Sequence, residues 1–321
     1  MRLGKLDNEQ LERLILSKFS HTREEVVLSP RIGVDCTALE LGGKLAVLST
    51  DPITSADNNI GRLTVHVCCN DAAAAGAEPV GLLVTLLVPP TSTQEDIGRV
   101  ADELAEASQL AGIDIIGGHT EVTDSVTRMV TCATVIAKAT ADRIITSGGM
   151  KPGDDIVLTK HAGLEGAAVI AEDFADRLTQ IAPLELAEAR SFANSLSVVK
   201  EGLFAAAHSA SAMHDVTEGG VMGALWEMAH ASGCGVRVKS ANIPVHPATS
   251  HICAALGLDP LRLLSSGCML ISCPDGKYLV QELLTIGIAA KLIGVATEDS
   301  AVICDEAVVM PPQADELYKL F

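Results

Sequence analysis

The aspartates of the first half are the residues whose type and spacing offer the clearest chemistry. Asp35 and Asp51 flank short apolar runs of the kind that form buried strands, and Asp71 follows in the next helical segment. Each of the first two, taken alone, is explained by a turn. Strand ends of one sheet are neighbours in space, however, and Mg²⁺ takes one or two carboxylates and completes its shell with water and phosphate oxygens. The three aspartates together predict a metal–nucleotide site.

Asn70 and Asp71 interrupt an apolar, alanine-rich stretch that otherwise has a helical pattern as far as Gly76. Both are poor helix formers, because their short polar side chains compete for backbone hydrogen bonds. A buried carboxylate without a partner costs several kcal/mol or shifts its pKa. We therefore expect a cationic group to meet Asp71. An ordinary salt bridge or a helix N-cap is the structural alternative.

A pair of glycines, Gly117 and Gly118, follows a predicted strand and precedes His119, Thr120 and Glu121. Paired glycines allow a ligand to approach the backbone closely. His119 and Glu121 could then add a ligand or a proton-transfer group. A glycine-bearing bulge with ordinary surface residues explains the same pattern, and both interpretations stay open.

A further candidate lies in the second half, where Asp215, Thr217, Gly219 and Gly220 precede a predicted helix. The aspartate or the threonine can cap that helix. The glycines leave backbone N–H groups exposed, which suits an anion at a helix N-terminus. A plain helix cap is the simpler interpretation.

The elements that must position these residues follow from hydrophobic periodicity. In the first half we predict helices at 7–19, 59–75 and 93–111, and strands at 44–49, 81–88, 113–116 and 127–137. In the second half we predict strands at 156–159, 236–238, 268–272 and 292–295, and helices at 182–193, 195–208, 220–231 and 277–286. The fold class is therefore α/β (α+β). Turn formers at 147–154 indicate a boundary, which gives domains over 1–146 and 147–321.

The composition excludes several classes of function. Lys and Arg number 23 against 41 Asp and Glu, and a net charge of −18 disfavours nucleic acid and anionic membrane surfaces as partners. The longest apolar stretch, 80–88, is about half the ~20 residues that a membrane span needs. The nine cysteines are an odd number without a C-x-x-C pair, which is typical of reduced thiols, so we expect a cytoplasmic protein.

Vicinal Cys68 and Cys69 are most simply two small buried residues on a helix. The phosphate-loop motif G-x-x-x-x-G-K-[ST] and the dinucleotide motif G-x-G-x-x-G do not occur in the sequence. A nucleotide remains possible, because Mg²⁺ can bridge phosphates to carboxylates.

The order of the motifs is more specific than any one of them. Along the chain stand Thr50-Asp51 after a strand, Asn70-Asp71-x4-Gly76-Ala77-Glu78-Pro79, Gly117-Gly118-x-Thr120, Gly153-Asp154-x-Ile156-Val157-x-Thr159 and Asp215-x-Thr217-x-Gly219-Gly220. This set, over nearly the whole chain, resembles the aminoimidazole ribonucleotide (AIR) synthetase superfamily. The resemblance implies two α/β domains, the first of which pairs with a second copy into a homodimer with a barrel-like core. It implies ATP and Mg²⁺ near that interface.

The chemistry that the resemblance implies is ATP-dependent phosphorylation, usually of a carbonyl or amide oxygen. By position, Asp51 and Asp71 correspond to the metal–phosphate carboxylates, with Asp35 a third. By position, Asn70 and Thr120 also correspond to nucleotide-site residues, and Asp215 to the acid that the second domain offers to the site. Together with the residues singled out above, we therefore predict Asp71, His119 and Asp215 as catalytic residues, and Asn70, Gly117, Gly118, Thr120, Lys160, Gly219 and Gly220 as nucleotide-site residues. Phosphoryl transfer depends mainly on positioning and charge neutralisation, which such a set can supply.

Among the branches of the superfamily, the segment from Asp215 to Gly220 is most similar to the hydrogenase-maturation proteins (HypE). That branch carries its substrate on a C-terminal cysteine, as a thiocarboxamide that is dehydrated to a thiocyanate. The last cysteine here is Cys304, inside a predicted strand, which argues against carbamoyl dehydration. The purine enzyme has Glu at the position of His119. Selenophosphate synthetases carry a reactive cysteine in a loop whose setting differs from that of Cys36.

The leading hypothesis is therefore an Mg-ATP-dependent enzyme that phosphorylates a carbonyl or amide oxygen of a small or protein-borne substrate. A non-catalytic nucleotide-binding scaffold in a maturation complex is the alternative from another class. A kinase similar to thiamine-monophosphate kinase, and a purely structural dimer module, are weaker alternatives. ATP turnover by the pure protein distinguishes the first hypothesis from the scaffold.

Overall fold

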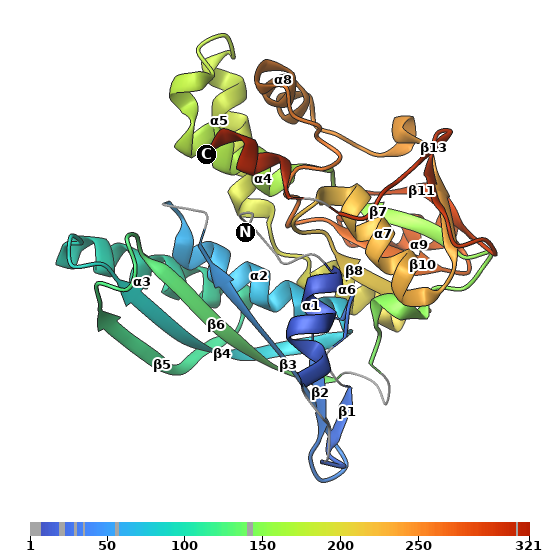
Figure 1. Cartoon of the computed structure of the whole chain (residues 1–321), viewed down its shortest axis with the longest axis horizontal. Helices are drawn as coiled ribbons and strands as arrows, with labels where there is room; N and C mark the ends of the chain where they lie inside the picture. Colours follow the sequence, from blue (N-terminus) through green and yellow to red (C-terminus); the bar gives the residue numbers. More distant parts are fainter. Residues whose placement is uncertain are drawn as a thin grey trace.

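The computed structural model contains two β-sheets, one in each half of the chain, with helices packed against them (Figure 1). The structure describes residues 8–18, 23–28, 31–34, 36–54, 58–139, 144–312 and 314–321. Asp35 therefore lies outside the described residues, and nothing below depends on its position.

The N-terminal sheet has six strands in the order β1-β2-β3-β6-β4-β5. β4 and β5 are parallel, and the other neighbouring pairs are antiparallel. The strands are β1 (Val26–Leu28), β2 (Thr37–Glu40), β3 (Leu45–Ile53), β4 (Ala77–Val88), β5 (Asp114–Val122) and β6 (Val130–Ala139).

Helices α2 (Ile60–Ala74) and α3 (Gln94–Ala111) cover one face of this sheet, and α1 (Asn8–Leu14) precedes the first strand (Figure 1). Thirteen of the fifteen residues of α2 are buried, because α2 also packs against the second domain. Gly76, with φ +71°, follows its last turn, where a left-handed glycine ends a helix without steric cost. The predicted helix at 59–75 and its glycine stop are confirmed.

The C-terminal sheet has seven strands in the order β13-β12-β9-β11-β7-β10-β8. They are β7 (Asp155–Thr159), β8 (Ala212–Asp215), β9 (Gly235–Val238), β10 (Met269–Cys273), β11 (Ala290–Thr297), β12 (Val302–Cys304) and β13 (Ala307–Val308). The helices are α4 (Leu164–Asp173), α5 (Pro183–Ser191), α6 (Val199–Ala207), α7 (Gly220–Ser232), α8 (Pro247–Leu256) and α9 (Gly276–Thr285), with 3₁₀ turns that include Phe192–Ser195 and Glu316–Leu320.

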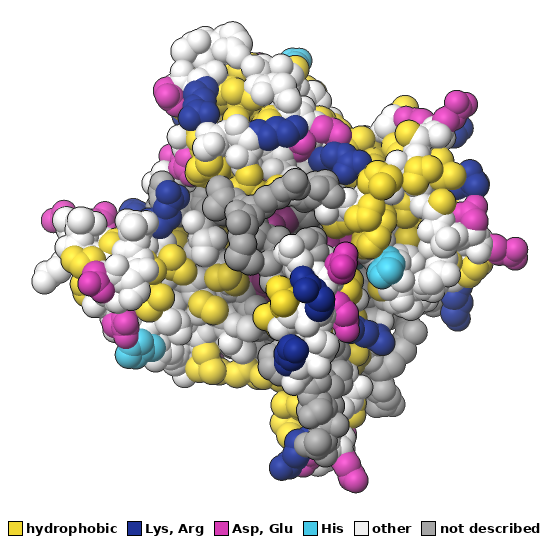
Figure 2. Space-filling view, in the orientation of Figure 1, with side chains coloured by type: hydrophobic (Ala, Val, Ile, Leu, Met, Phe, Trp, Pro, Cys, Tyr) yellow, Lys and Arg dark blue, Asp and Glu magenta, His cyan; other side chains and the backbone are white. Residues whose placement is uncertain are grey.

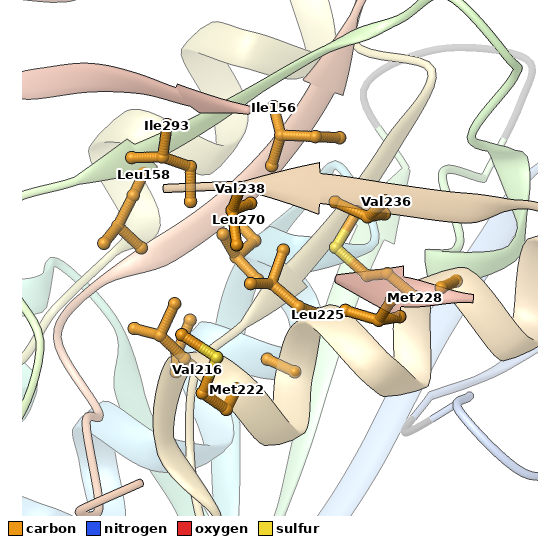
Figure 3. Close-up of a cluster of buried hydrophobic side chains, with 14 of the residues drawn as sticks. Ile156, Leu158, Val216, Met222, Leu225, Met228, Val236, Val238, Leu270 and Ile293 are labelled. Atoms are coloured by element: carbon orange, nitrogen blue, oxygen red, sulfur yellow. The ribbon is translucent and has the colours of Figure 1, made fainter. Parts of the chain in front are cut away.

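Aliphatic and methionine side chains fill the core of this second domain. Leu225 and Met228 of α7 pack onto strand residues such as Val236 and Leu270 (Figure 3). All four are almost fully buried, which fixes α7 against the sheet. The start of α7, where the Gly219–Gly220 motif lies, is therefore held by the core.

Two strands are longer than the sequence predicts, and this changes the setting of two motifs. The predicted strand at 44–49 is too short: β3 continues to Ile53, and Pro52 lies opposite Cys132 of β6. Proline is tolerated because β2 pairs with β3 only as far as Leu48, so β6 is the only described strand bonded at that end. Likewise β5 does not stop before the glycine pair but includes it.

None of the helices among the described residues is long and apolar enough to cross a membrane. Lys and Arg side chains are interspersed with Asp and Glu on the face shown in Figure 2.

The burial of α2 has a consequence for stability at low pH. Burial, together with the positive charges of Arg62 and Lys160, lowers the pKa of His66 from 6.5 to about 4. Protonation therefore favours the unfolded chain, so stability is full above pH 6.5 and is lost as the pH falls toward 4. At about 1.4 kcal/mol per pKa unit, the loss amounts to ~3 kcal/mol.

Urea unfolding of the wild type and of His66→Gln at pH 7 and pH 4.5 tests this prediction. Buried acids with raised pKa act in the opposite direction, so the difference between the two proteins is the relevant quantity. The variant should show the smaller loss of unfolding free energy at pH 4.5. Equal losses in both proteins would show that His66 is not the group responsible.

Candidate active site between the two domains

Asp71 lies near the C-terminal end of α2 and is 5% exposed. The hydroxyl of Ser49 on β3 donates a hydrogen bond of 2.5 Å to its Oδ2 atom. The same Ser49 Oγ lies 3.5 Å from Oδ2 of Asp51. Ser49 and Asp51 are two residues apart on one strand, so both point toward α2. A single hydroxyl thus links the carboxylates of Asp51 and Asp71, which are twenty residues apart in sequence.

The two linked carboxylates fit the chemistry of a magnesium ion. Both offer hard oxygen ligands, and Mg²⁺ uses one or two carboxylates when water and phosphate complete its shell. Among the described residues no group of three His, Cys, Asp or Glu is placed to hold a metal on its own. Ser49, a neutral hydroxyl, is one partner of Asp71, and the cationic group expected beside this carboxylate stays a prediction.

A pocket between the domains brings Asp71 together with residues of the second domain. It is lined by Cys36 and Asp71 on one side and by Met213, His214 and Asp215 of β8 on the other. Asp215 is the last residue of β8 and is 2% exposed. Two of the predicted catalytic residues, Asp71 and Asp215, therefore line one pocket although they belong to different domains.

His214 is a site residue that was not among the predicted catalytic or binding residues. Its Nε2 atom lies 3.0 Å from Oε2 of Glu227 on α7, and its Nδ1 atom lies 3.9 Å from Oδ1 of Asp215. The contact with Glu227 orients the imidazole beside Asp215. The sequence does hold a signal for His214 as a site residue, because His214 directly precedes Asp215. Glu227 lies twelve residues beyond Asp215, and nothing in the sequence marks it as a site residue.

The cysteines near this pocket differ in character. Cys36, the residue before β2, donates from Sγ to the backbone oxygen of Asp71 on α2 at 3.2 Å. Burial raises the pKa of Cys68, and it raises the pKa of Cys69 to about 12. Both thiols stay protonated at neutral pH and are poor nucleophiles. The prediction that Cys68 and Cys69 are small buried residues on a helix is confirmed.

Asn70 points to the other side of α2 and connects the domains. Its Nδ2 donates to the oxygen of Leu196 at 2.8 Å, and its Oδ1 accepts from the nitrogen of Val198 at 2.8 Å. The side chain is fully buried. Through these two hydrogen bonds, Asn70 holds the 196–198 segment beside the site.

Lys160 supports the same segment from the second domain. Its ammonium group contacts Glu201 Oε1 at 2.8 Å and donates to the backbone oxygens of Ser195 and Ser197 at 3.1 and 2.6 Å. Two of the three N–H donors of the ammonium group are used by these backbone oxygens, and its charge is paired with the carboxylate of Glu201. We therefore place Lys160 in the scaffold of the site and not among the groups that contact phosphate.

The Gly219–Gly220 turn is occupied by the chain itself. The nitrogen of Gly219 donates to Oδ2 of Asp315 at 2.7 Å, and Asp315 also accepts from Leu317. A Cβ at Gly220 would lie 2.6 Å from the backbone oxygen of Leu261, so close packing requires glycine there. The carboxylate of Asp315, and not an external anion, meets the N–H group that the sequence suggested for a ligand.

Residues 117–120 lie on β5, at the edge of the N-terminal sheet and exposed. Asp51 pairs with Ala133, Ala133 with Val84 and Val84 with Gly118, so β5 is three strands from Asp51, or about 14 Å. A Cβ at Gly118 would meet the backbone oxygen of Val84 at 1.8 Å, so this glycine permits close pairing of strands.

His119, which shares β5 with Thr120 and the glycines, contacts Glu121 at 2.9 Å. Within one protomer the structure therefore separates His119, Thr120, Gly117 and Gly118 from the carboxylates of Asp51 and Asp71.

Comparison with known families agrees with this architecture. Residues 33–139 match the family model described as AIR synthase related protein, N-terminal domain, and residues 151–305 match its C-terminal domain. The chain belongs to the AIR synthase related family. The predicted domain boundary at residue 146 lies between the two matched segments.

Within this family the chain is similar to hydrogenase-maturation proteins. The chain is 30% identical over 285 residues to carbamoyl dehydratase HypE of Rhizobium leguminosarum bv. viciae, covering 84% of this chain and 78% of that protein. It is 28% identical over 320 residues to a hydrogenase expression/formation protein of Methanocaldococcus jannaschii, covering 95% and 92%. A HypE crystal structure in complex with ATP has the same fold, with a TM-score of 0.71, 21% identity and coverage of 98% and 97%. The chain is accordingly an enzyme of the HypE-related group.

Proposed function

We propose that this protein is an Mg-ATP-dependent enzyme that phosphorylates a carbonyl or amide oxygen of a small or protein-borne substrate. The observation that carries the proposal is the pair of carboxylates, Asp51 and Asp71, linked through Ser49, of which Asp71 lines the same pocket as Asp215. The similarity to carbamoyl dehydratase HypE and to a HypE structure with ATP supports it.

The roles follow from the chemistry of each group. Asp51 and Asp71 would hold the magnesium ion, which when bound neutralises charge on the transferring phosphate. Asp215 approaches the pocket from the second domain, where the phosphate acceptor would lie. His214, oriented by Glu227, positions Asp215. Phosphorylation converts a carbonyl or amide oxygen into a better leaving group, which is the step that a dehydration needs.

Calorimetric titration of the pure protein with ATP, with magnesium and then with EDTA, tests the proposal. We expect saturable binding with magnesium and a large loss of affinity without it, together with release of phosphate on prolonged incubation. Binding of equal strength in EDTA, or no binding at all, would overturn the role of the carboxylate pair.

We also propose that the protein is a homodimer, with the N-terminal sheet at its core, as the family resemblance implies. On the face of this sheet opposite α2, Leu83 and Val80 of β4 are 43% and 48% exposed, and Ile116 of β5 is exposed as well. A contiguous exposed apolar strand surface of this kind indicates an interaction site.

Replacing Leu83 by Asp should convert the dimer into a monomer, because a carboxylate at the centre of an apolar contact would be buried without a partner. Light scattering after size-exclusion chromatography measures the mass directly. Leu184→Asp, at an exposed leucine of α5 in the other domain, is the matched control and should leave the mass unchanged. A dimeric Leu83→Asp variant would place the interface elsewhere.

A further inference from the structure

A second pocket lies between the domains at the opposite end of α2. It is a small pocket of about 30 Å³, and it is lined by Asn59 and Leu63 from the start of α2 and by Glu165, Val169 and Leu196 from the second domain. Leu63 precedes Asp71 by eight residues, or ~12 Å along a helix. The pocket is thus distinct from the carboxylate pair.

Glu165 is the polar group on which this pocket depends. It is 6% exposed, and its Oε2 atom is buried with no hydrogen-bond partner. Ser266 hydrogen-bonds to the carboxyl group through its side chain and backbone. Within the described part of the chain no salt bridge reaches Glu165. An unpaired buried carboxylate oxygen is costly unless an N–H donor or a cation meets it.

The charged neighbours make the pocket unfavourable for an anion. Asp315 and Glu218 lie close enough to raise the pKa of Glu165, which burial alone already raises, to about 7. At the rim, Glu172 pairs with Nε of Arg190 at 3.0 Å, and Asp173 accepts a hydrogen bond from Asn58 at 2.8 Å. The positive charge of Arg190 is therefore already paired with Glu172, and the net charge around the pocket stays negative.

The remaining lining is aliphatic. Leu63, Ala168, Val169 and Leu196 form walls around the buried carboxyl group. A ligand that fits must combine N–H donors and a positive charge with a short apolar stem. Ammonium and guanidinium groups on alkyl chains have these properties, and guanidinium can meet a carboxylate with two parallel hydrogen bonds.

We propose that this pocket is a binding site for the ammonium or guanidinium group of a small organic cation, with Glu165 as its buried acceptor. The site is separate from the metal–nucleotide site and requires no nucleotide. Its existence can therefore be tested whether or not the protein transfers phosphate.

The test is a calorimetric titration of the full chain, without nucleotide, with methylguanidinium chloride and with tetramethylammonium chloride. Both ions carry one positive charge, but only methylguanidinium has N–H donors. We expect saturable binding of methylguanidinium in the millimolar range and at least tenfold weaker binding of tetramethylammonium. Absence of saturable binding, or equal binding of both ions, would overturn the proposal.

Glu165→Gln should weaken methylguanidinium binding at least tenfold, since it removes the charge and keeps the size. Glu298→Gln, at an exposed glutamate far along the chain, is the matched control and should bind as the wild type does. Ala193→Leu fills the pocket without changing any charge and should also abolish binding. If the Glu165 variant does not fold, the Ala193→Leu variant still tests whether methylguanidinium binds in this pocket. Wild-type affinity in Ala193→Leu would exclude this pocket as the binding site.

Discussion

Replacing Asp71 by Asn is expected to reduce ATP turnover by about a hundredfold or more, on the order of 2.7 kcal/mol of transition-state stabilisation. The amide keeps the size of the carboxylate, and its oxygen can still accept the 2.5 Å hydrogen bond from Ser49. What it loses is the negative charge that binds the metal beside the phosphates. Steady-state phosphate release at saturating ATP, repeated over a range of magnesium concentrations, measures the effect.

Two comparisons make this result specific. Asp102→Asn changes an exposed aspartate on α3 and should leave turnover unaffected. Ser49→Ala removes the hydroxyl between Asp51 and Asp71, keeps both charges, and should produce an intermediate loss with a higher magnesium requirement. Wild-type turnover in the Asp71 variant would mean that the metal binds elsewhere.

Local patterns predicted most of the elements that support this site. The helix over 59–75 followed from apolar periodicity and a glycine stop, and α2 has those limits within one residue. The link between Asp51 and Asp71 through Ser49 was not predicted, because the predicted strand at 44–49 ended before Asp51. Residues two apart on β3 face the same side, so strand periodicity by itself is enough to place Ser49 beside Asp51.

The contacts that the sequence did not predict join residues far apart in the chain. Asp315 meets Gly219 across 96 positions, and its carboxylate occupies a turn that the local sequence suggested for an anion. Lys160 is bound by backbone oxygens of the 195–197 segment, which no periodicity reveals. Likewise, strand order, and not spacing, puts β5 three strands from β3. Long-range pairing therefore decides which motif residues share a site.

Replacing Asn70 by Ala is expected to destabilise the protein by about 3–5 kcal/mol. The side chain is fully buried, and it hydrogen-bonds the carbonyl of Leu196 and the N–H of Val198, both at 2.8 Å. Alanine would leave these two buried backbone groups without partners, at ~1–3 kcal/mol each, and it would also leave a small cavity. Urea unfolding followed by circular dichroism measures the change.

Asn194→Ala is the matched control for this prediction. Asn194 accepts a hydrogen bond of 2.5 Å from Arg62 in an exposed setting, so its loss should cost less than about 1 kcal/mol. A similarly small effect in Asn70→Ala would mean that the 196–198 segment does not depend on the hydrogen bonds of the Asn70 side chain. Because Asn70 directly precedes Asp71 on α2, a folded Asn70 variant should also require more magnesium for turnover, which separates a loss of positioning from a loss of stability alone.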